Sequence, residues 1–229
     1  MASPTASHSG QTVVVTGANR GIGLELCRQL KARGHRVIAL CRDSSHELKA
    51  LQVEILTGID VSLDEVEHRV RLALTEVSID WLIHNAGMLY REGLEQLSFD
   101  HVRQQFETNA LGPLRVTRGL LENLHAGSKI LIVSSKVGSI GENVTGGHYG
   151  YRMTKAAVNA AGVSLSIDLR PRGIAVGMVH PGHVRTSMGG AHAPSSVEES
   201  ASNLLNRLEG LNLETSGTFW NADGAILPW

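Results

Sequence analysis

A glycine-rich turn, TGANRGIG at residues 16–23, stands between a short β-branched run and a helical pattern. The run QTVVVTG (11–17) predicts a buried strand, and IGLELCRQLKARG (22–34) predicts a helix that stops at Gly34. Glycine permits the backbone angles of a tight turn and lets a ligand approach the main chain. The free N–H groups of the helix start favour an anion such as a pyrophosphate. Because the spacing is not G-x-G-x-x-G, a plain strand-to-helix turn remains the alternative.

The rest of the chain repeats this alternation of strand and helix. Further strands are predicted over 35–43, 52–60, 80–87, 128–135, 173–182 and 216–224. Helices are predicted from an N-cap at Ser62, over 98–125, over 149–170 and over 197–208. Such alternation predicts an α/β fold: a doubly wound parallel sheet of about seven strands with helices on both faces. No internal linker or repeat divides it, which favours a single domain.

Composition excludes several classes of protein. The 229 residues carry 21 Lys and Arg against 22 Asp and Glu, so no basic excess indicates nucleic acid. No apolar stretch is long enough for a membrane span. The polar start MASPTASHSG (1–10) predicts a flexible leader and not a signal peptide. Two isolated cysteines, Cys27 and Cys41, predict free thiols in a reducing, cytoplasmic compartment.

The end of the second predicted strand, Leu40-Cys41-Arg42-Asp43, bears on the choice of nucleotide. In nucleotide-binding α/β folds an acid at this point binds the ribose 2′-hydroxyl, whereas an arginine accommodates a 2′-phosphate. Arg42, together with Arg20 of the glycine turn, favours NADP(H). Asp43 keeps NAD(H) as the alternative.

The segment YGYRMTK (149–155) holds two tyrosines and one lysine on a predicted helix. Tyr151 lies four positions before Lys155, so the two side chains share a helix face, whereas Tyr149 lies six positions before it. Tyrosine has a free pKa of about 10, and a nearby ammonium favours its phenolate. Tyr151 and Lys155 are therefore candidates for a proton-transfer pair, although most such pairs are ordinary helix surface.

Six motifs occur in the order typical of one family. They are TGANRGIG (16–23), HNAG (84–87), TNALG (108–112), VSS (133–135), YRMTK (151–155) and HPGHVRT (180–186). On these motifs the chain resembles the short-chain dehydrogenase/reductases from residue 11 onward. The stretches HPGHVRTSMGG and SGTFWNADGAILPW resemble the bacterial C-factor or C-signal proteins and the related small carbonyl reductases. The resemblance implies one NAD(P)-binding Rossmann domain over residues 11–229.

The resemblance also implies roles for four catalytic residues. Tyr151 would give a proton to the carbonyl oxygen as general acid, and Ser135 would donate a hydrogen bond to the same oxygen. Lys155 would lower the pKa of Tyr151 and hold the ribose, while Asn109 would anchor a water. Ser134 is a weaker rival for the serine role, because Ser135 and Tyr151 are sixteen positions apart, more than the family's usual spacing.

The expected cofactor contacts combine the glycine turn, the arginine at the end of the second strand and the positions that match family motifs. They are Gly17, Asn19, Arg20, Gly21, Ile22, Gly23, Arg42, Asp60, Val61, Asn85, Ala86, Gly87, Tyr151, Lys155, Pro181, Gly182, Val184 and Thr186. One position departs from the family, because His84 stands where asparagine is usual.

Taken together, these features predict NADPH-dependent reduction of a ketone or aldehyde. The alternative is a C-signal-like signalling or regulatory protein that binds NAD(P) and keeps the fold. The eleven histidines show no H-E-x-x-H or paired Cys/His spacing, so no metal site is predicted, and no G-x-S-x-G elbow indicates a hydrolase.

Assembly is predicted from the helix 149–170, which carries a run of small residues. They are Ala156, Ala157, Ala160, Ala161 and Gly162. The resemblance implies that this helix and 98–125 pair across a two-fold axis in a homodimer. A tetramer stays open through a second contact by the C-terminal ILPW, and a monomer would follow if the small residues pack on the chain's own sheet.

Overall fold

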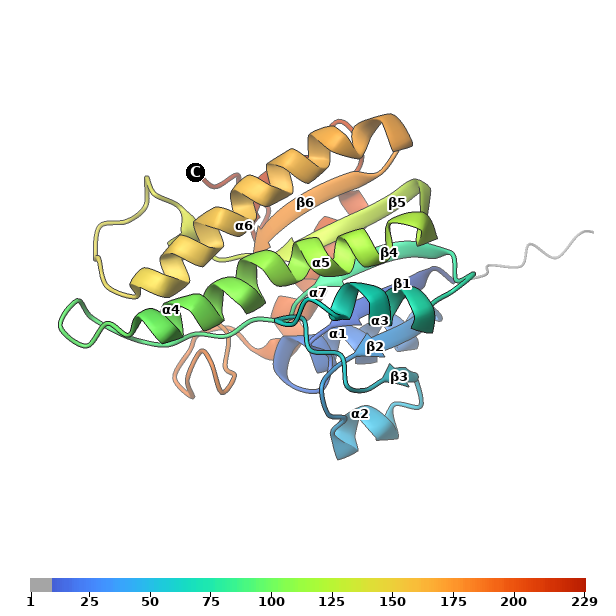
Figure 1. The fold of residues 1–229 in the computed structure, drawn as a ribbon, viewed down its shortest axis with the longest axis horizontal. Coiled ribbons are helices and arrows are strands. Elements are labelled where there is room, and N and C mark those ends of the chain that lie inside the picture. The colour runs from blue at the N-terminus through green and yellow to red at the C-terminus, as the bar shows by residue number, and fades with distance from the viewer. Residues whose placement is uncertain (1–9) are drawn as a thin grey trace, which may run out of the picture.

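A single seven-stranded sheet forms the centre of the molecule in the computed structural model, which describes residues 10–229. All but the last residue of the expected leader therefore lies outside the described residues. The strand order is β3-β2-β1-β4-β5-β6-β7, and every neighbouring pair is parallel (Figure 1). The strands are β1 (Thr12–Thr16), β2 (Arg36–Leu40), β3 (Glu54–Leu56), β4 (Ile79–His84), β5 (Leu124–Val133), β6 (Ala175–His180) and β7 (Phe219–Asn221). The predicted doubly wound fold is confirmed.

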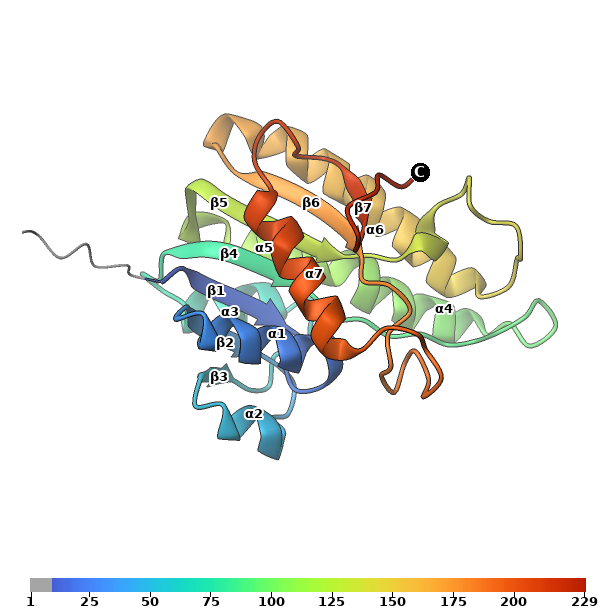
Figure 2. The same cartoon turned by 180° about the vertical axis from the view of Figure 1, so that it is seen from behind.

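Helices cover both faces of this sheet. Figure 1 shows α3, α5 and α6 on one face, and Figure 2 shows α1 and α7 on the other. The helices are α1 (Gly21–Ala32), α2 (His46–Ala50), α3 (Val66–Ala73), α4 (Phe99–Phe106), α5 (Gly112–Gly119), α6 (Tyr149–Asp168) and α7 (Val197–Gly210). Four short turns complete the list: the π-helical η1 (Glu107–Leu111) and the 3₁₀ turns η2 (Leu121–Asn123), η3 (Lys136–Gly138) and η4 (Arg170–Arg172).

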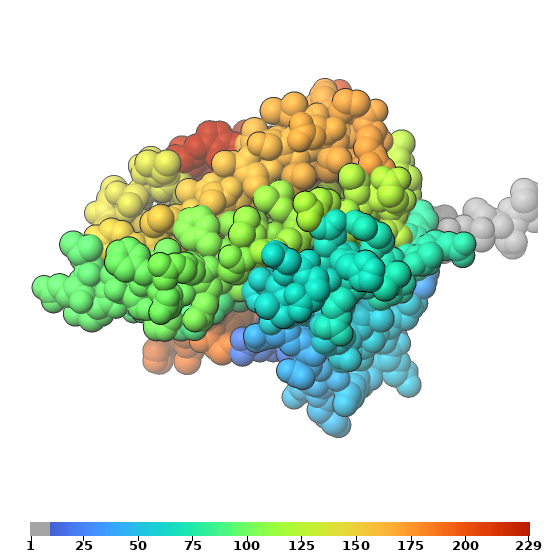
Figure 3. All heavy atoms as spheres, viewed as in Figure 1, coloured from blue at the N-terminus to red at the C-terminus, as the bar shows by residue number. Residues whose placement is uncertain are grey.

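Alternation along the strands divides the core into two layers. Val13 and Val15 of β1 pack with Leu26 of α1 and with α7, and all three side chains are fully buried. Val14 points the opposite way and packs with Val116 of α5 and with α6. Because both faces are covered, the strands read as continuous apolar runs. Figure 3 shows α3, α5 and α6 closing one of these faces.

Two predicted boundaries were wrong for local reasons. Ser62 does not cap a helix, because its N–H and hydroxyl both donate to the Asp60 carboxylate, at 3.0 and 2.7 Å, and α3 begins at Val66. The helix predicted over 98–125 is divided by the π-helical turn η1 and ends before β5, which begins at Leu124. Helix α2 was not predicted, since five residues are too few to show a helical period.

Candidate active site

A cleft of about 800 Å³ opens at the carboxyl ends of the strands, beside the point where the chain passes from one half of the sheet to the other. In open α/β sheets ligands bind at this switch point. The residues expected to contact the cofactor that line it are Gly17, Asn19, Arg20, Gly21, Ile22, Arg42, Asp60, Val61, Asn85, Ala86, Gly87, Tyr151, Lys155, Pro181 and Thr186. The remaining three, Gly23, Gly182 and Val184, do not line the cleft.

The glycine turn is shaped by close backbone approach. Gly17 has φ +65°, and a Cβ there would lie 2.8 Å from Ala86 Cα. A Cβ on Gly23 would lie 2.3 Å from Gly17 O, which explains why Gly23 is needed although it does not face the cleft. Arg20, the N-cap of α1, makes no side-chain capping bond. The first helical N–H groups are thus left for a ligand, and the turn fits a nucleotide pyrophosphate.

The end of β2 presents a cation to the cleft. Arg42 lines the cleft, its side chain is 70 % exposed, and its guanidinium lies 3.9 Å from the Asp60 carboxylate. An exposed ion pair at this distance leaves Arg42 free to move to another anion. Asp43 is exposed and does not line the cleft; its carbonyl accepts a hydrogen bond from the Asn19 amide at 3.0 Å. This geometry favours a phosphate over a free ribose hydroxyl.

The two tyrosines at the start of α6 lie in different environments. Tyr151 lines the cleft and is half-buried, whereas Tyr149 is exposed and does not line it. Lys155 is buried on the same side of α6, with its Nζ 5.7 Å from the centroid of the Tyr151 ring. Its ammonium donates to the Val133 carbonyl at 2.8 Å, which fixes it at the end of β5.

The two serines after β5 point to different partners. Ser134 donates its hydroxyl to Asn159 Oδ1 of α6 at 2.6 Å, so this side chain is already engaged inside the core. The Ser135 hydroxyl accepts the Val137 N–H at 3.4 Å and lies near enough to the Tyr151 phenol to lower the pKa of that group. Although Ser134 lines the cleft and Ser135 does not, the engagement of Ser134 with Asn159 and the nearness of Ser135 to the phenol favour Ser135 as the partner in chemistry.

Asn109 lies in the π-helical turn η1, a distortion that is frequent at functional sites. Its amide group donates to Met88 O at 2.9 Å and to Thr154 Oγ1 at 3.1 Å. Its Oδ1 accepts the Met88 N–H at 2.8 Å. The side chain therefore holds the segment after β4 against α6, and the water expected on Asn109 has no free amide N–H to accept from.

Burial is the main influence on the pKa values of Tyr151 and Lys155. Burial raises the pKa of Tyr151, while the hydrogen bond from Ser135 and the charge of Arg91 act in the opposite direction. Burial also lowers the pKa of Lys155 to about 8. The lowering of the Tyr151 pKa by Lys155 stays a prediction, and in the chain alone burial outweighs the influences that lower this pKa. Tyr151 is a neutral phenol at pH 7, the form that a proton donor needs.

Several residues that line the cleft carry no signal in the sequence. Arg91, which does not line the cleft itself, donates to the carbonyl of the lining residue Met188 and so joins the segment after β4 to the segment after β6. The lining residues are Cys41, Ile59, Ser62, Leu63, Met88, Gln104, Glu107, Thr108, Val133, Ser187 and Met188. Most of them lie in loops or helix ends, where neither periodicity nor a motif marks them. Within residues 10–229, no three His, Cys, Asp or Glu side chains form a metal-binding group.

His84, the departure from the family pattern, is enclosed at the end of β4. Its side chain is 3 % exposed, and its Nε2 lies 2.8 Å from Thr117 Oγ1 of α5. Burial lowers the pKa of His84 to about 3. The imidazole is therefore neutral and ties the sheet to α5, close to the turn that carries Asn109.

The fold and the cleft define a nucleotide-binding Rossmann domain. A family model described as short chain dehydrogenase matches residues 11–196, and the chain belongs to this family of oxidoreductases. It is 38 % identical over 224 residues to the 1-hydroxy-2-glutathionyl-2-methyl-3-butene dehydrogenase of Rhodococcus sp. (strain AD45), which covers 95 % of this chain and 99 % of that protein. It is 42 % identical to the C-signal of Myxococcus xanthus over 66 % of this chain and 93 % of that protein.

Solved structures agree with this assignment. A carbonyl reductase from Pseudomonas aeruginosa PAO1, crystallised in complex with NADP, superposes with a TM-score of 0.85 and 33 % identity. The match covers 96 % of this chain and 100 % of that one. The predicted membership of the short-chain dehydrogenases, with likeness to C-signal and to carbonyl reductases, is confirmed. Among residues 10–229, no helix has the length and apolarity that a membrane crossing requires.

We expect His84→Asn to reduce the loss of stability in acid. A histidine with a pKa of about 3 when folded and about 6.5 when unfolded takes up its proton more readily in the unfolded chain. Its stabilising contribution is complete above pH 6.5 and is lost as the pH falls toward 3. At pH 5 the loss is about 2 kcal/mol. Urea unfolding at pH 7 and at pH 5 gives the free energy of unfolding at each pH, and the difference between the two values measures this loss.

The exposed His68 of α3 provides the control, as His68→Asn. The free energy of unfolding should fall by the same amount between pH 7 and pH 5 in wild type and in His68→Asn. In His84→Asn it should fall by less. Equal differences in all three proteins would mean that His84 titrates normally in the folded chain.

Proposed function

We propose that the protein reduces a ketone or aldehyde to an alcohol with NADPH. The observation that carries this proposal is the Tyr151 phenol, which faces a nucleotide cleft with the Ser135 hydroxyl nearby and Lys155 one helical turn away. A pure binding module has no need for this arrangement. The carbonyl reductase from P. aeruginosa that superposes on the chain contains NADP, which supports both the reaction and the cofactor.

The bound cofactor supplies the hydride that reduces the carbonyl carbon. Tyr151 donates its proton to the oxygen as negative charge develops there, which a neutral phenol is able to do. Ser135 donates a hydrogen bond to the same oxygen and stabilises that charge. Lys155 holds a positive charge beside the phenolate that remains after proton transfer, and the Val133 carbonyl keeps it in place. Asn109 positions Met88 at the edge of the cleft.

The choice of NADP(H) over NAD(H) rests on Arg42. Its exposed guanidinium at the end of β2 is able to reach a 2′-phosphate, with Arg20 as a second cation of the same cleft. The free and buried thiols of Cys27 and Cys41 are consistent with a reducing, cytoplasmic compartment.

A signalling role like that of C-signal is the second candidate. Its support is the 42 % identity to the C-signal of M. xanthus over 66 % of this chain. The four residues Asn109, Ser135, Tyr151 and Lys155 are all present and grouped around the cleft, which favours an enzyme. A regulatory role that accompanies catalysis is compatible with the same site.

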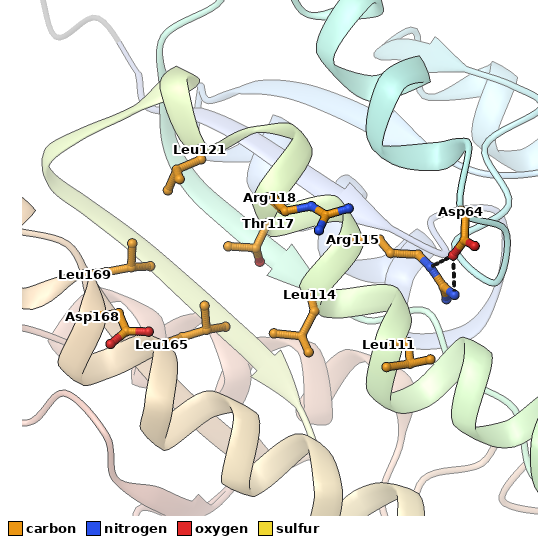
Figure 4. Close-up of a pocket in the computed structure, with 10 residues that line it drawn as sticks. All are labelled: Asp64, Leu111, Leu114, Arg115, Thr117, Arg118, Leu121, Leu165, Asp168 and Leu169. Atoms are coloured by element: carbon orange, nitrogen blue, oxygen red, sulfur yellow. Dashed lines mark hydrogen bonds and ion pairs between the residues drawn. The ribbon is translucent and has the colours of Figure 1, made fainter.

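A homodimer is proposed from a groove between α5 and α6, shown in Figure 4. The groove has a volume of about 520 Å³ and is mainly lined by leucines, Leu111, Leu114, Leu121, Leu165 and Leu169. Of the small residues on α6, Gly162 packs on the chain's own sheet, because a Cβ there would lie 2.3 Å from Met178 Sδ. Ala160 is exposed on α6, and so is Ile167. These two residues do not line the groove, so a second copy of this chain, related by a two-fold axis, would cover the groove together with this neighbouring surface of α6.

Tyr151→Phe should lower kcat for carbonyl reduction by on the order of 10² to 10⁴, since it removes a positioned proton donor and little else. NADPH oxidation with a panel of aldehydes and ketones measures the rate, and Tyr149→Phe is the matched control on the exposed side of the same helix. Comparable activity in both variants would refute the assignment of Tyr151.

Arg42→Ala should weaken NADPH binding about 10- to 100-fold, the value of one charge-assisted contact to phosphate. NADH binding should change little, because NADH has no 2′-phosphate. Fluorescence titration with both nucleotides measures the two dissociation constants. An equal effect on both would make Arg42 an ordinary surface charge.

Ala160→Arg should convert the dimer to a monomer, since a two-fold interface meets each substitution twice. The control is Ala50→Arg, at an exposed alanine of α2. Sedimentation at micromolar concentration should give twice the chain mass of 24.6 kDa for wild type and control, and a single mass for Ala160→Arg. A fully active wild-type species of one chain mass would rule out the dimer.

A further inference from the structure

Arg115 of α5 joins two segments that lie far apart in the sequence. Its Nε donates to Asp64 Oδ1 at 2.7 Å, an ion pair drawn in Figure 4. Its other nitrogens donate to Glu107, one to the carboxylate at 2.6 Å and one to the main-chain carbonyl at 3.2 Å. The Arg115 side chain is only 14 % exposed, in contrast to the other arginines that form ion pairs on α3 and α5.

Both segments belong to the cleft. Residues 59–63 line one end of it and include Asp60 and Val61, which are expected beside the adenine. Glu107 and Thr108 line it from the π-helical turn η1, where Asn109 follows directly. Arg115 thus lies behind the cleft and holds its two walls from outside.

The two walls also touch directly. A Cβ on Gly112 would lie 3.0 Å from Val61 Cγ2 and 3.1 Å from Val61 O. Glycine at 112 therefore lets the 59–64 segment rest on the main chain at the end of η1. A movement of this segment on ligand binding would reach Gly112 through its contact with Val61, and would reach Glu107 through the Asp64–Arg115 ion pair.

The π-helical turn is the element that such a movement is able to shift. In η1 the Gly112 N–H donates to Glu107 O, a bond that spans five residues. An α-helical register would instead close the bond from Leu111 N–H to the same oxygen. The two registers differ in the direction of the Asn109 side chain. The Nη1 of Arg115 also donates to Glu107 O, so it holds the acceptor on which the π register depends.

We propose that Arg115 is a positioning residue that couples nucleotide binding at residues 59–64 to the π-helical turn carrying Asn109. The identity of the nucleotide rests on the proposed function. The Asp64 carboxylate is 90 % exposed, and an exposed ion pair alone contributes little to stability. The Arg115 guanidinium, however, is only 14 % exposed and also makes two bonds to Glu107, so it is held in place and restrains both segments. Without Arg115, the 59–64 segment and the turn η1 both remain folded, but no charged contact links them.

Hydrogen exchange with and without NADPH tests the coupling without relying on turnover. In wild type, NADPH should slow exchange of the amides in 59–64 and in 107–112. In Arg115→Gln the protection of 59–64 should remain, and that of 107–112 should fall by about tenfold, the effect of losing one charge-assisted hydrogen bond. Arg71→Gln, which removes an exposed ion pair between Arg71 and Glu67 on α3, should match wild type.

The outcomes separate the two proposals. Full protection of 107–112 in Arg115→Gln overturns the coupling while the proposed function stands. Absence of NADPH protection at 59–64 in wild type overturns the proposed function and the coupling with it. If Arg115→Gln does not fold, Asp64→Ala gives the same test, because it removes the partner of Arg115 in the 59–64 segment and leaves the bonds of Arg115 to Glu107 in place.

Turnover supplies a second readout that a merely structural role would not move. Arg115→Gln should lower kcat about tenfold with little change in KM for the carbonyl compound, since Asn109 is displaced but the substrate end of the cleft is not. Arg115→Lys, which keeps the charge and one bond, should recover part of the rate. Light scattering on each variant checks that its oligomeric state is that of wild type. Equal losses of kcat in the glutamine and lysine variants would contradict the role.

Discussion

Thr16 and Asn85 join the two halves of the sheet at the point where it divides. The Thr16 hydroxyl accepts the N–H groups of Asn85 and Ala86 at 3.0 and 3.1 Å, and the Asn85 amide donates back to Thr16 O and Gly17 O at 3.1 Å each. These bonds bring the turn after β4 against the glycine turn after β1. The two turns pack closely at Gly17, where a Cβ would lie 2.8 Å from Ala86 Cα, and the cleft opens beside this contact.

The rest of the site depends on this junction. Asn109 holds Met88, three residues beyond Asn85, against α6, and Lys155 of α6 is fixed to the end of β5. Each side chain proposed to be catalytic therefore has a hydrogen-bonded or buried anchor in an element that also belongs to the core. Burial raises the pKa of Tyr151 and lowers that of Lys155. For both side chains, the neutral form is therefore favoured more in the protein than it is in water. The site is a consequence of the packing and is not placed on a mobile loop.

The sequence predicted the parts of the structure that repeat. Valine-rich runs such as Val13–Val15 gave the strands, because a sheet covered on both faces needs continuous apolar residues. The glycine turn and the pair Tyr151 and Lys155 were found through spacing and resemblance. Ser62, by contrast, was misread as a cap, since its preference for the Asp60 carboxylate depends on how the turn folds. The π-helical turn and the contacts of Arg115 and Arg91 were not predicted, because they depend on register and on distant segments.

The all-parallel order of the strands also bears on how the chain folds. Parallel neighbours need long crossovers, so closing the sheet brings together residues far apart in the sequence, and such folds form slowly. The cleft takes residues from the segments that follow β1, β2, β4 and β6, from the end of β5, and from η1 and α6. An intermediate that has paired β1 with β2 but not with β4 has only half of it. A nucleotide that binds the complete cleft therefore stabilises the fully folded chain and not the partly paired intermediate. Its free energy of binding adds to the free energy of unfolding of the whole chain.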